Sequence, residues 1–373
     1  MQRFTWSFLK NSVNYTLIIR ESCNFAPENN SNRSNYTKMK QIKNILAAAT
    51  LLALPMTFTS CEDILGEWSK PVPSQGKFIV YTDKDTKTFV DIPADAIVWT
   101  GTVAPGDLAA GTYVVEGNVV CSGDIKLTGE TKLILKDGAK LTVNRLSYIT
   151  GGILNIYGQS DDEATMGQLV CKVLAVDALN IYGGNITVAN EDHSVNYTVQ
   201  SFSGDMTIYA GILRATSGYD AAILVAPEKT LTINGETVIA RSLSIYCRAG
   251  ISAGTVVING GTVEAYGSDN PNDPTHYKGQ GAPGILYATS FDYQGGSLTA
   301  ICGAPTSATP SSCAIATETG GGDSYYVAGS LHNTSAAAVT VNTSTDRTTW
   351  SGTQQNIAAG AIQALNFQGI KIE

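Results

Sequence analysis

The chain has 373 residues, of which 43% are hydrophobic and 15% charged, and this composition permits a large buried core and excludes general disorder. Residues 1–60 hold 7 Lys+Arg against 2 Asp+Glu, whereas residues 61–373 hold 17 against 30, a net charge of −13. A surface that acidic repels phosphate backbones, so nucleic acid is not expected as a partner.

Residues 39–60 have the order of a secretory signal peptide. Lys40 and Lys43 precede an apolar run over residues 45–55, and small and polar residues lead to Cys61. The apolar run is short for a bilayer span. Residues 58–61 resemble the lipobox of Gram-negative lipoproteins, which implies lipid attachment at Cys61, a membrane anchor, and an outer-membrane or cell-surface location. A plain secreted protein is the alternative.

The segments on either side of this signal are given separate interpretations. Residues 1–38 are rich in Asn, and because a signal peptide works at an N-terminus, we predict that Met39 is the true start and that 1–38 is an upstream mis-start segment. Residues 61–100 begin with a polar stretch containing Pro71 and Pro73, which predicts a tether followed by an N-terminal cap.

A short phrase recurs through the middle of the chain, as in "LNIYGQ" at Leu154 and "LNIYGG" at Leu179. The residues that follow the pair "IY" or "IN" lie 25, 27, 25, 25 and 35 positions apart, at Gly158, Gly183, Ala210, Gly235, Gly260 and Gly295. A fixed period of this size indicates stacked units. Each unit holds about three short strands separated by turns, which favours a parallel β-helix over a propeller.

Aligned columns support this interpretation, because strand periodicity turns alternate residues inward. One predicted inward column is Ile156, Ile181, Ile208, Ile233 and Ile258; a second is Leu154, Leu179, Met206, Leu231 and Val256; a third, of small residues, is Val188, Ala215, Ala240, Ala265 and Ala300. The predicted fold is therefore all-β, a single-stranded right-handed parallel β-helix with about 25 residues per coil over residues 101–303, with C-terminal coils and a cap over 304–373.

Sites for chemistry are sparse. No histidine has metal-ligand spacing, and the Gly-rich phrases open no helix, so zinc and phosphate sites are not expected. Acidic residues near comparable turns, Glu191, Asp192 and Asp220, are candidate calcium ligands, although solvated turn residues are the favoured explanation for them. Cys302 and Cys313 flank one loop and are either bridged by a disulfide or unpaired.

Two groups of side chains are candidate ligand-binding residues. Tyr157, Tyr182 and Tyr209 occupy the same outward position on successive coils, which predicts either a structural ladder or a platform for sugar rings. The unit with the 35-residue interval carries an insertion at 268–279, where solenoids often bind ligands. Its candidate residues are Asp269, Asp273, His276 and Tyr277.

The phrases "INGGTVEAYG" (258–267), "GGNITVAN" (183–190) and "GAPGILYAT" (281–289) resemble bacterial secreted β-helix proteins of the carbohydrate-binding-domain type. This resemblance implies a surface lipoprotein that binds polysaccharide or glycan without catalysis and without an obligatory cofactor, with calcium as an option. The alternative is a structural or adhesive protein with a protein partner. A third is a calcium-dependent polysaccharide lyase, with Arg214 as the only basic residue well placed among the acids.

Overall fold

The computed structural model describes residues 2–10, 13–21, 76–149, 151–194, 198–269, 279–305, 312–318, 326–350 and 354–373. The chain divides into two units, Met1–Pro71 and Val72–Glu373. In the first unit, β1 (Gln2–Lys10) and β2 (Val13–Glu21) pair as an antiparallel hairpin. Cys61 and the predicted signal peptide lie outside the described residues. Over the part of the chain described, there is no α-helix, and hence none long and apolar enough to cross a membrane.

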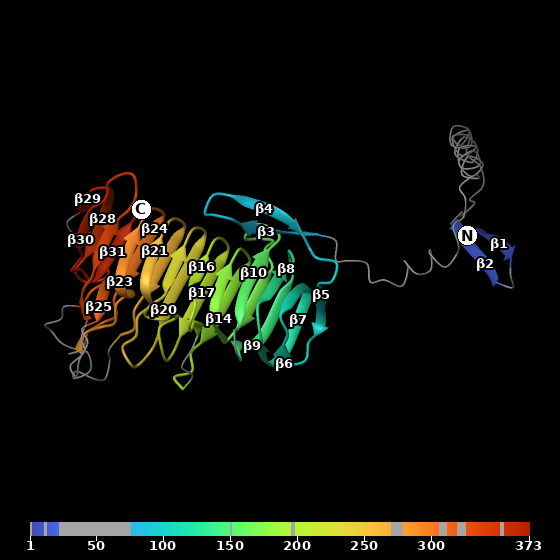
Figure 1. The fold of residues 1–373 in the computed structure, drawn as a ribbon, viewed down its shortest axis with the longest axis horizontal. Helices are drawn as coiled ribbons and strands as arrows, with labels where there is room; N and C mark the ends of the chain where they lie inside the picture. Colours follow the sequence, from blue (N-terminus) through green and yellow to red (C-terminus); the bar gives the residue numbers. More distant parts are fainter. Residues whose placement is uncertain are drawn as a thin grey trace, which may run out of the picture. The chain divides into compact units, whose positions relative to one another are not determined.

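The second unit is a parallel β-helix whose coils stack on one another (Figure 1). Three parallel sheets form its walls, and we call them faces A, B and C in the order in which the chain visits them. The all-β fold class and the three strands per coil are therefore confirmed. Apart from the strands of the end coils, each strand of a face pairs with strands one coil before and one coil after it, which satisfies its backbone N–H and C=O groups.

The strands are assigned to the faces by their register. The first coil contains β5 (Ile97–Thr102) and β6 (Gly106–Leu108), and both pair with β7 (Gly111–Leu127). Face A continues with β8 (Thr131–Leu135), β10 (Ile153–Gly158), β13 (Ala178–Ile181), β16 (Met206–Ile208) and β19 (Thr230–Ile233). Face B contains β11 (Gln168–Cys171), β14 (Asn185–Asn190), β17 (Ile212–Ser217), β20 (Thr237–Ser242), β22 (Thr262–Tyr266) and β24 (Ser297–Ile301). Face C contains β12 (Val173–Val176), β15 (Val199–Ser201), β18 (Ile223–Val225) and β25 (Ile315–Glu318). The longer strands turn corners. β9 (Lys140–Tyr148) runs from face B to C, β21 (Ile251–Ile258) and β23 (Ile285–Tyr293) run from face C to A, β5 runs from face A to B, and β7 runs through all three faces.

All three predicted inward columns are confirmed. The isoleucine column pairs in register as Ile156↔Ile181, Ile181↔Ile208, Ile208↔Ile233 and Ile233↔Ile258. The small-residue column pairs as Val188↔Ala215, Ala215↔Ala240, Ala240↔Ala265 and Ala265↔Ala300. The members of all three columns are at most 1% exposed, so the core is one continuous apolar column along the solenoid axis.

Antiparallel strands close the C-terminal end on each face. β27 (Ser330–Asn333) pairs with β30 (Ile362–Ala364) on face A, and β26 (Tyr326–Ala328) pairs with β25 on face C. On face B, β31 (Gly369–Ile372) pairs with β24 and with β28 (Val339–Ser344), which is followed by β29 (Gln355–Ile357). A reversed strand ends the parallel stacking, because the next parallel coil has no matching edge.

At the other end, the described part of the predicted tether and cap forms a hairpin against the side of the stack. β3 (Lys77–Tyr81) and β4 (Lys87–Asp91) pair antiparallel and lie along the outside of face A (Figure 1). Phe78 packs edge-on against Tyr157 with 4.8 Å between ring centroids, and both are at least 94% buried. The side-chain amide of Gln159 donates to the Lys77 carbonyl at 3.1 Å. The hairpin is therefore part of the folded unit.

We predict that Phe78→Ala lowers the free energy of unfolding of the hairpin by about 3 kcal/mol, because it deletes a buried ring and leaves a cavity over Tyr157. Phe89→Ala, in the same hairpin but 56% exposed, is the matched control and should change stability by less than about 0.5 kcal/mol. Hydrogen exchange of the amides of β3 and β4 measures both. Equal protection in the two variants would contradict the packing described here.

Left-handed glycines make the corner between faces A and B. Gly184, Gly211, Gly261 and Gly296 occupy the same place in their coils, with φ between 79° and 95°. A Cβ on Gly261 would lie 2.5 Å from the carbonyl oxygen of Glu236 in the coil before it. Glu236 fills this corner position in the remaining coil with φ of 60°. The backbone hydrogen bond that follows Glu236, from the Thr237 N–H to the Gly211 carbonyl, is 3.3 Å long. The equivalent hydrogen bond after Gly211, from the Ile212 N–H to the Gly184 carbonyl, is 2.8 Å long.

We predict that Glu236→Gly raises the free energy of unfolding by about 1 kcal/mol, because glycine relieves the left-handed strain. Burial and the charges of Asp161 and Glu163 raise the pKa of Glu236, so its carboxylate destabilises the fold once ionised. The gain should therefore be larger at neutral pH than below the usual pKa of glutamate. Glu236→Gln removes the charge and keeps the strain, so urea unfolding of both variants separates the two causes; an unchanged or lower stability for Glu236→Gly would be contrary to expectation.

Candidate functional site

The tyrosine ladder exists, and its rings are stacked face to face. Tyr157 to Tyr182 and Tyr182 to Tyr209 are each 4.7 Å between centroids and 7° from parallel. Sugar rings stack on free aromatic faces, and here the faces of the middle ring are taken by its neighbours. Tyr157 is also covered by the hairpin, and Tyr81 lies 6.4 Å from Tyr209. Glycan binding at these rings stays a prediction, whereas the geometry favours a structural role.

The amides beside this ladder are also engaged in the structure. Asn180 donates to the Asn155 side-chain oxygen at 2.9 Å, and Asn155 donates to Glu130 at 3.1 Å. Burial and the carboxylate of Asp161 together raise the pKa of Tyr81 to about 12. Asp161 also forms an ion pair with Lys87 across the tip of the hairpin. The contacts of Tyr81 and Lys87 with Asp161 therefore hold the hairpin against face A.

The acidic residues proposed as calcium ligands have other partners. Asp192 accepts hydrogen bonds from the backbone and hydroxyl of Ser194, at 2.9 and 2.8 Å, which lower the pKa of its carboxyl. Asp220 accepts the Ala221 N–H and lies 3.8 Å from Nε of Arg248. Glu191 is exposed. Among the described residues no three His, Cys, Asp or Glu side chains form a metal site, so calcium here stays a prediction that the geometry does not favour.

Arg214 is the basic residue of the lyase alternative, and that role stays a prediction. Its register confirms that it lies between Thr187 and Ile239 on the outside of face B. Its guanidinium donates to Glu163 and to Asn185, each at 3.0 Å. Glu163 lies in the acidic stretch "SDDEA" at residues 160–164 and is therefore bound in a surface ion pair with Arg214. Neither residue is placed as a base beside paired acids.

The loops between faces B and C are the irregular part of the solenoid. They are short at Lys172 but span 191–198, 218–222, 243–250, 267–284 and 302–314 on later coils. The corner between faces A and B uses three residues in the coils that follow β13, as at 182–184 and 209–211. We call the first region the B–C corner. The predicted insertion at 268–279 belongs to it, but Asp273, His276 and Tyr277 lie outside the described residues.

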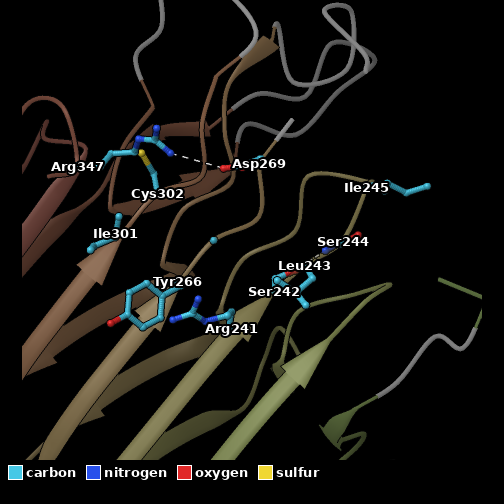
Figure 2. A pocket seen from close by; sticks show the side chains of 11 residues that line it. Arg241, Ser242, Leu243, Ser244, Ile245, Tyr266, Asp269, Ile301, Cys302 and Arg347 are labelled. Atoms are coloured by element: carbon cyan, nitrogen blue, oxygen red, sulfur yellow. Dashed lines mark hydrogen bonds and ion pairs between the residues drawn. The ribbon is translucent and has the colours of Figure 1, made fainter. Parts of the chain in front are cut away.

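The larger cleft on this corner, cleft 1, has a volume of about 430 Å³. Figure 2 shows Arg241 beside Tyr266 on one side, and Arg347 with Asp269 on the other. The Arg241 guanidinium lies 4.5 Å from the Tyr266 ring centroid, a cation–π contact. Nη1 of Arg347 is 3.6 Å from the Asp269 carboxylate. Of the predicted insertion residues, Asp269 is the one that the structure places in a cleft.

Local structure orients the two arginines. Arg241 is the penultimate residue of β20, on the outer surface of face B and in register with Tyr266. Arg347 has φ of 73° in a turn that Asp346 fixes by accepting the N–H groups of Thr348 and Thr349, at 3.0 and 2.7 Å. The hydroxyl of Thr349, which donates to this carboxylate at 2.6 Å, and these backbone hydrogen bonds hold the pKa of the Asp346 carboxyl below its usual range. Burial, together with a hydrogen bond to Glu264, raises the pKa of Tyr266.

The loop that begins at Ser242 has an inverted pattern of burial. Ser242 and Ser244 are 3% and 2% exposed, and their hydroxyls donate to the carbonyls of Asp220 and Tyr219. The side chains between and after them point outward, and Leu243, Ile245 and Tyr246 are 44%, 44% and 42% exposed. Buried hydroxyls with exposed apolar side chains are the reverse of a core pattern and indicate an interaction surface.

A smaller cleft of about 140 Å³, cleft 2, lies on earlier coils of the same corner. Asn144, Arg145, Lys172, Val173, Asn190 and Asp192 line it. Nε of Arg145 is 3.9 Å from Asp124, too far for a hydrogen bond, and within the described chain this buried donor has no hydrogen-bond partner. Buried donors are normally satisfied, so a polar ligand oxygen would complete this one.

No protein-family model, curated protein or solved structure matches the chain. The assignment of a parallel β-helix therefore stands on the register of its own strands. The choice of the B–C corner as the candidate site stands on geometry alone.

The described lining of cleft 1 offers the guanidinium groups of Arg241 and Arg347, the Tyr266 ring and the Asp269 carboxyl group. A few donors and acceptors beside a ring can bind a polar ligand. Burial raises the pKa of Cys302 to about 12, so the thiol in this cleft is not a ready nucleophile. Sequence reasoning missed Arg241, Tyr266, Tyr246 and Arg347. The one sequence signal was the 35-residue interval, which contains Tyr266. Arg241 and Tyr246 lie in a regular 25-residue interval and Arg347 lies beyond the last marker, so no change of period indicates them.

We predict that the five described cysteines resist alkylation at pH 8 in the native protein. All are buried reduced thiols, and burial raises the pKa of Cys171 and Cys247 to about 12 and of Cys313 to about 11. The reactive thiolate is therefore scarce. Peptide mass spectrometry after iodoacetamide treatment should find them labelled only in the denatured control. A disulfide-linked peptide joining Cys302 and Cys313 would show that the pair is oxidised instead.

Proposed function

We propose that this chain is a surface lipoprotein that binds polysaccharide without catalysis, and that the B–C corner is its binding surface. One observation carries this proposal: the long loops of the solenoid gather on one corner, where they border both clefts. Insertions on one side of a repeat protein commonly form its binding face. The signal peptide and lipobox resemblance at Cys61 support an outer-membrane or cell-surface location.

The side chains of the corner suit a sugar ligand. Arg241, Arg347 and Asp269 offer planar donors and acceptors for hydroxyl groups, and orientation by a few such groups is typical of ligand sites. Tyr246 is partly exposed, and its ring packs at 4.9 Å and 56° on Tyr219, which leaves ring surface for contact with the apolar side of a sugar. Calcium is an optional addition, since the carboxylates of the corner, such as that of Asp269, carry the oxygen atoms that calcium binds.

A protein partner is the second candidate function. The exposed side chains of Leu243 and Ile245 favour it, because aliphatic groups at a cleft rim are typical of protein contacts. Under this alternative the chain is a structural or adhesive surface protein. Absence of glycan binding by this chain, together with its binding to another surface protein, would support this alternative.

We predict that Tyr246→Ala and Arg241→Ala each weaken polysaccharide binding by about tenfold, because truncating an aromatic or arginine contact at the centre of an interface removes more than about 1 kcal/mol. The measurement is a glycan array followed by affinity electrophoresis, with and without EDTA. Phe89→Ala, an exposed aromatic on the hairpin, is the matched control and should bind like the parent.

The outcomes of this test separate the candidate functions. Loss of binding in EDTA would add calcium to the site, and release of shortened products would indicate a lyase or hydrolase. Equal binding by the parent and both corner variants would remove the B–C corner as the site. Binding lost in a Tyr182→Phe variant alone would return the site to the tyrosine ladder.

A further inference from the structure

The two clefts lie on the same corner at different heights along the solenoid. Cleft 2 is centred on the coil that contains Lys172, the residue directly after β11. Cleft 1 is centred on the coil that contains Tyr266, the last residue of β22. The register runs from β11 through β14, β17 and β20 to β22, which is four coil steps. At the usual spacing between paired strands, these steps separate the clefts by about 19 Å.

Each coil from β14, at the edge of cleft 2, to β20, at the edge of cleft 1, adds one planar side chain to the corner. His193 follows β14, Tyr219 follows β17 and Tyr246 follows β20. The imidazole of His193 is exposed and lies 2.5 Å from the carbonyl of Gly218 on the next coil. Tyr219 and Tyr246 are in ring contact. A row with one ring per coil step therefore connects Lys172 in cleft 2 to Tyr266 in cleft 1.

Cationic hydrogen-bond donors lie at both ends of this row, in cleft 2 and in cleft 1. Cleft 2 has Arg145 and Lys172, and cleft 1 has Arg241 and Arg347. The two linings also hold the carboxylates of Asp192 and Asp269, so their net charge is +2, against −13 for residues 61–373. Guanidinium and ammonium groups bind oxygen acceptors at both ends of the row, and the rings between them contact the flat sides of sugar units.

We propose that the ligand is an extended polysaccharide chain that runs parallel to the solenoid axis and occupies cleft 1 and cleft 2 at once. This inference rests on the proposed function. It goes beyond that function by assigning cleft 2 as a second subsite and by excluding a mode in which one cleft holds a chain end. Simultaneous contact makes binding at the second cleft intramolecular, which raises affinity without any new type of contact.

The test is calorimetric titration of the full chain with cello-, xylo- and galacturono-oligosaccharides, graded from disaccharide to decasaccharide. Affinity should rise by at least about tenfold when the oligosaccharide becomes long enough to span about 19 Å, and then level off. Lys172→Ala should remove this rise while leaving the affinity for the shortest binding oligosaccharide within about twofold, because those ligands occupy cleft 1, which Lys172 does not line. Arg145→Ala is a second variant with the same expected effect.

Lys132→Ala is the matched control, an exposed lysine on face A that should leave the length dependence unchanged. Affinity that is independent of chain length, or a Lys172→Ala variant that still shows the full rise, would overturn the two-subsite inference and leave polysaccharide binding in place. Absence of binding to every oligosaccharide and polysaccharide would overturn the proposed function and this inference together.

Discussion

Parallel hydrogen bonding between successive coils, residue against equivalent residue, is the constraint on which the rest of this structure depends. Because each side chain stands on its counterpart one coil earlier, a choice made at one position is repeated along the axis. The isoleucine column and the alanine column are two results, and both are at most 1% exposed. The stacked tyrosines and the Asn155–Asn180 amide pair are two more, on the outside. Stacking of this kind selects identical or similar residues because their shapes match at a separation of one strand spacing.

The same constraint decides where the chain is free to vary. At the corner between faces A and B, backbones approach so closely that a Cβ on Gly261 would meet a carbonyl oxygen at 2.5 Å. That corner leaves little room for insertions or larger side chains, and Glu236 carries both strain and a raised pKa there. The B–C corner also contains close backbone approaches, since a Cβ on Gly218 or Gly303 would lie 2.4 or 1.8 Å from the carbonyl oxygen of Glu191 or Ser268. The long loops nevertheless lie at this corner, where lengthening a surface loop adds little free energy, and the clefts lie among them.

Acidic residues have a different role in this molecule from the one their clustering suggests. Asp161 and Glu163 hold Lys87 and Arg214, so they tie the hairpin and face B together across a turn. Asp192 and Asp346 fix their own turns by accepting backbone N–H groups. Such exposed pairs contribute little stability each, yet they set the direction of neighbouring side chains such as Arg347. The cations of the B–C corner consequently stand out against an acidic background.

The sequence by itself determined the coil: its period, its inward columns and its glycine corners, because each depends on a local alternation that recurs in every coil. It also located the insertion near Asp269, since an interval of 35 residues departs from the period. Only the tertiary structure decided which outward residues are accessible. Phe78 covers Tyr157 from 79 positions away, and Arg347 reaches Asp269 from the C-terminal cap. Contacts of that kind follow from how distant segments pack on the finished stack, and no local pattern encodes them.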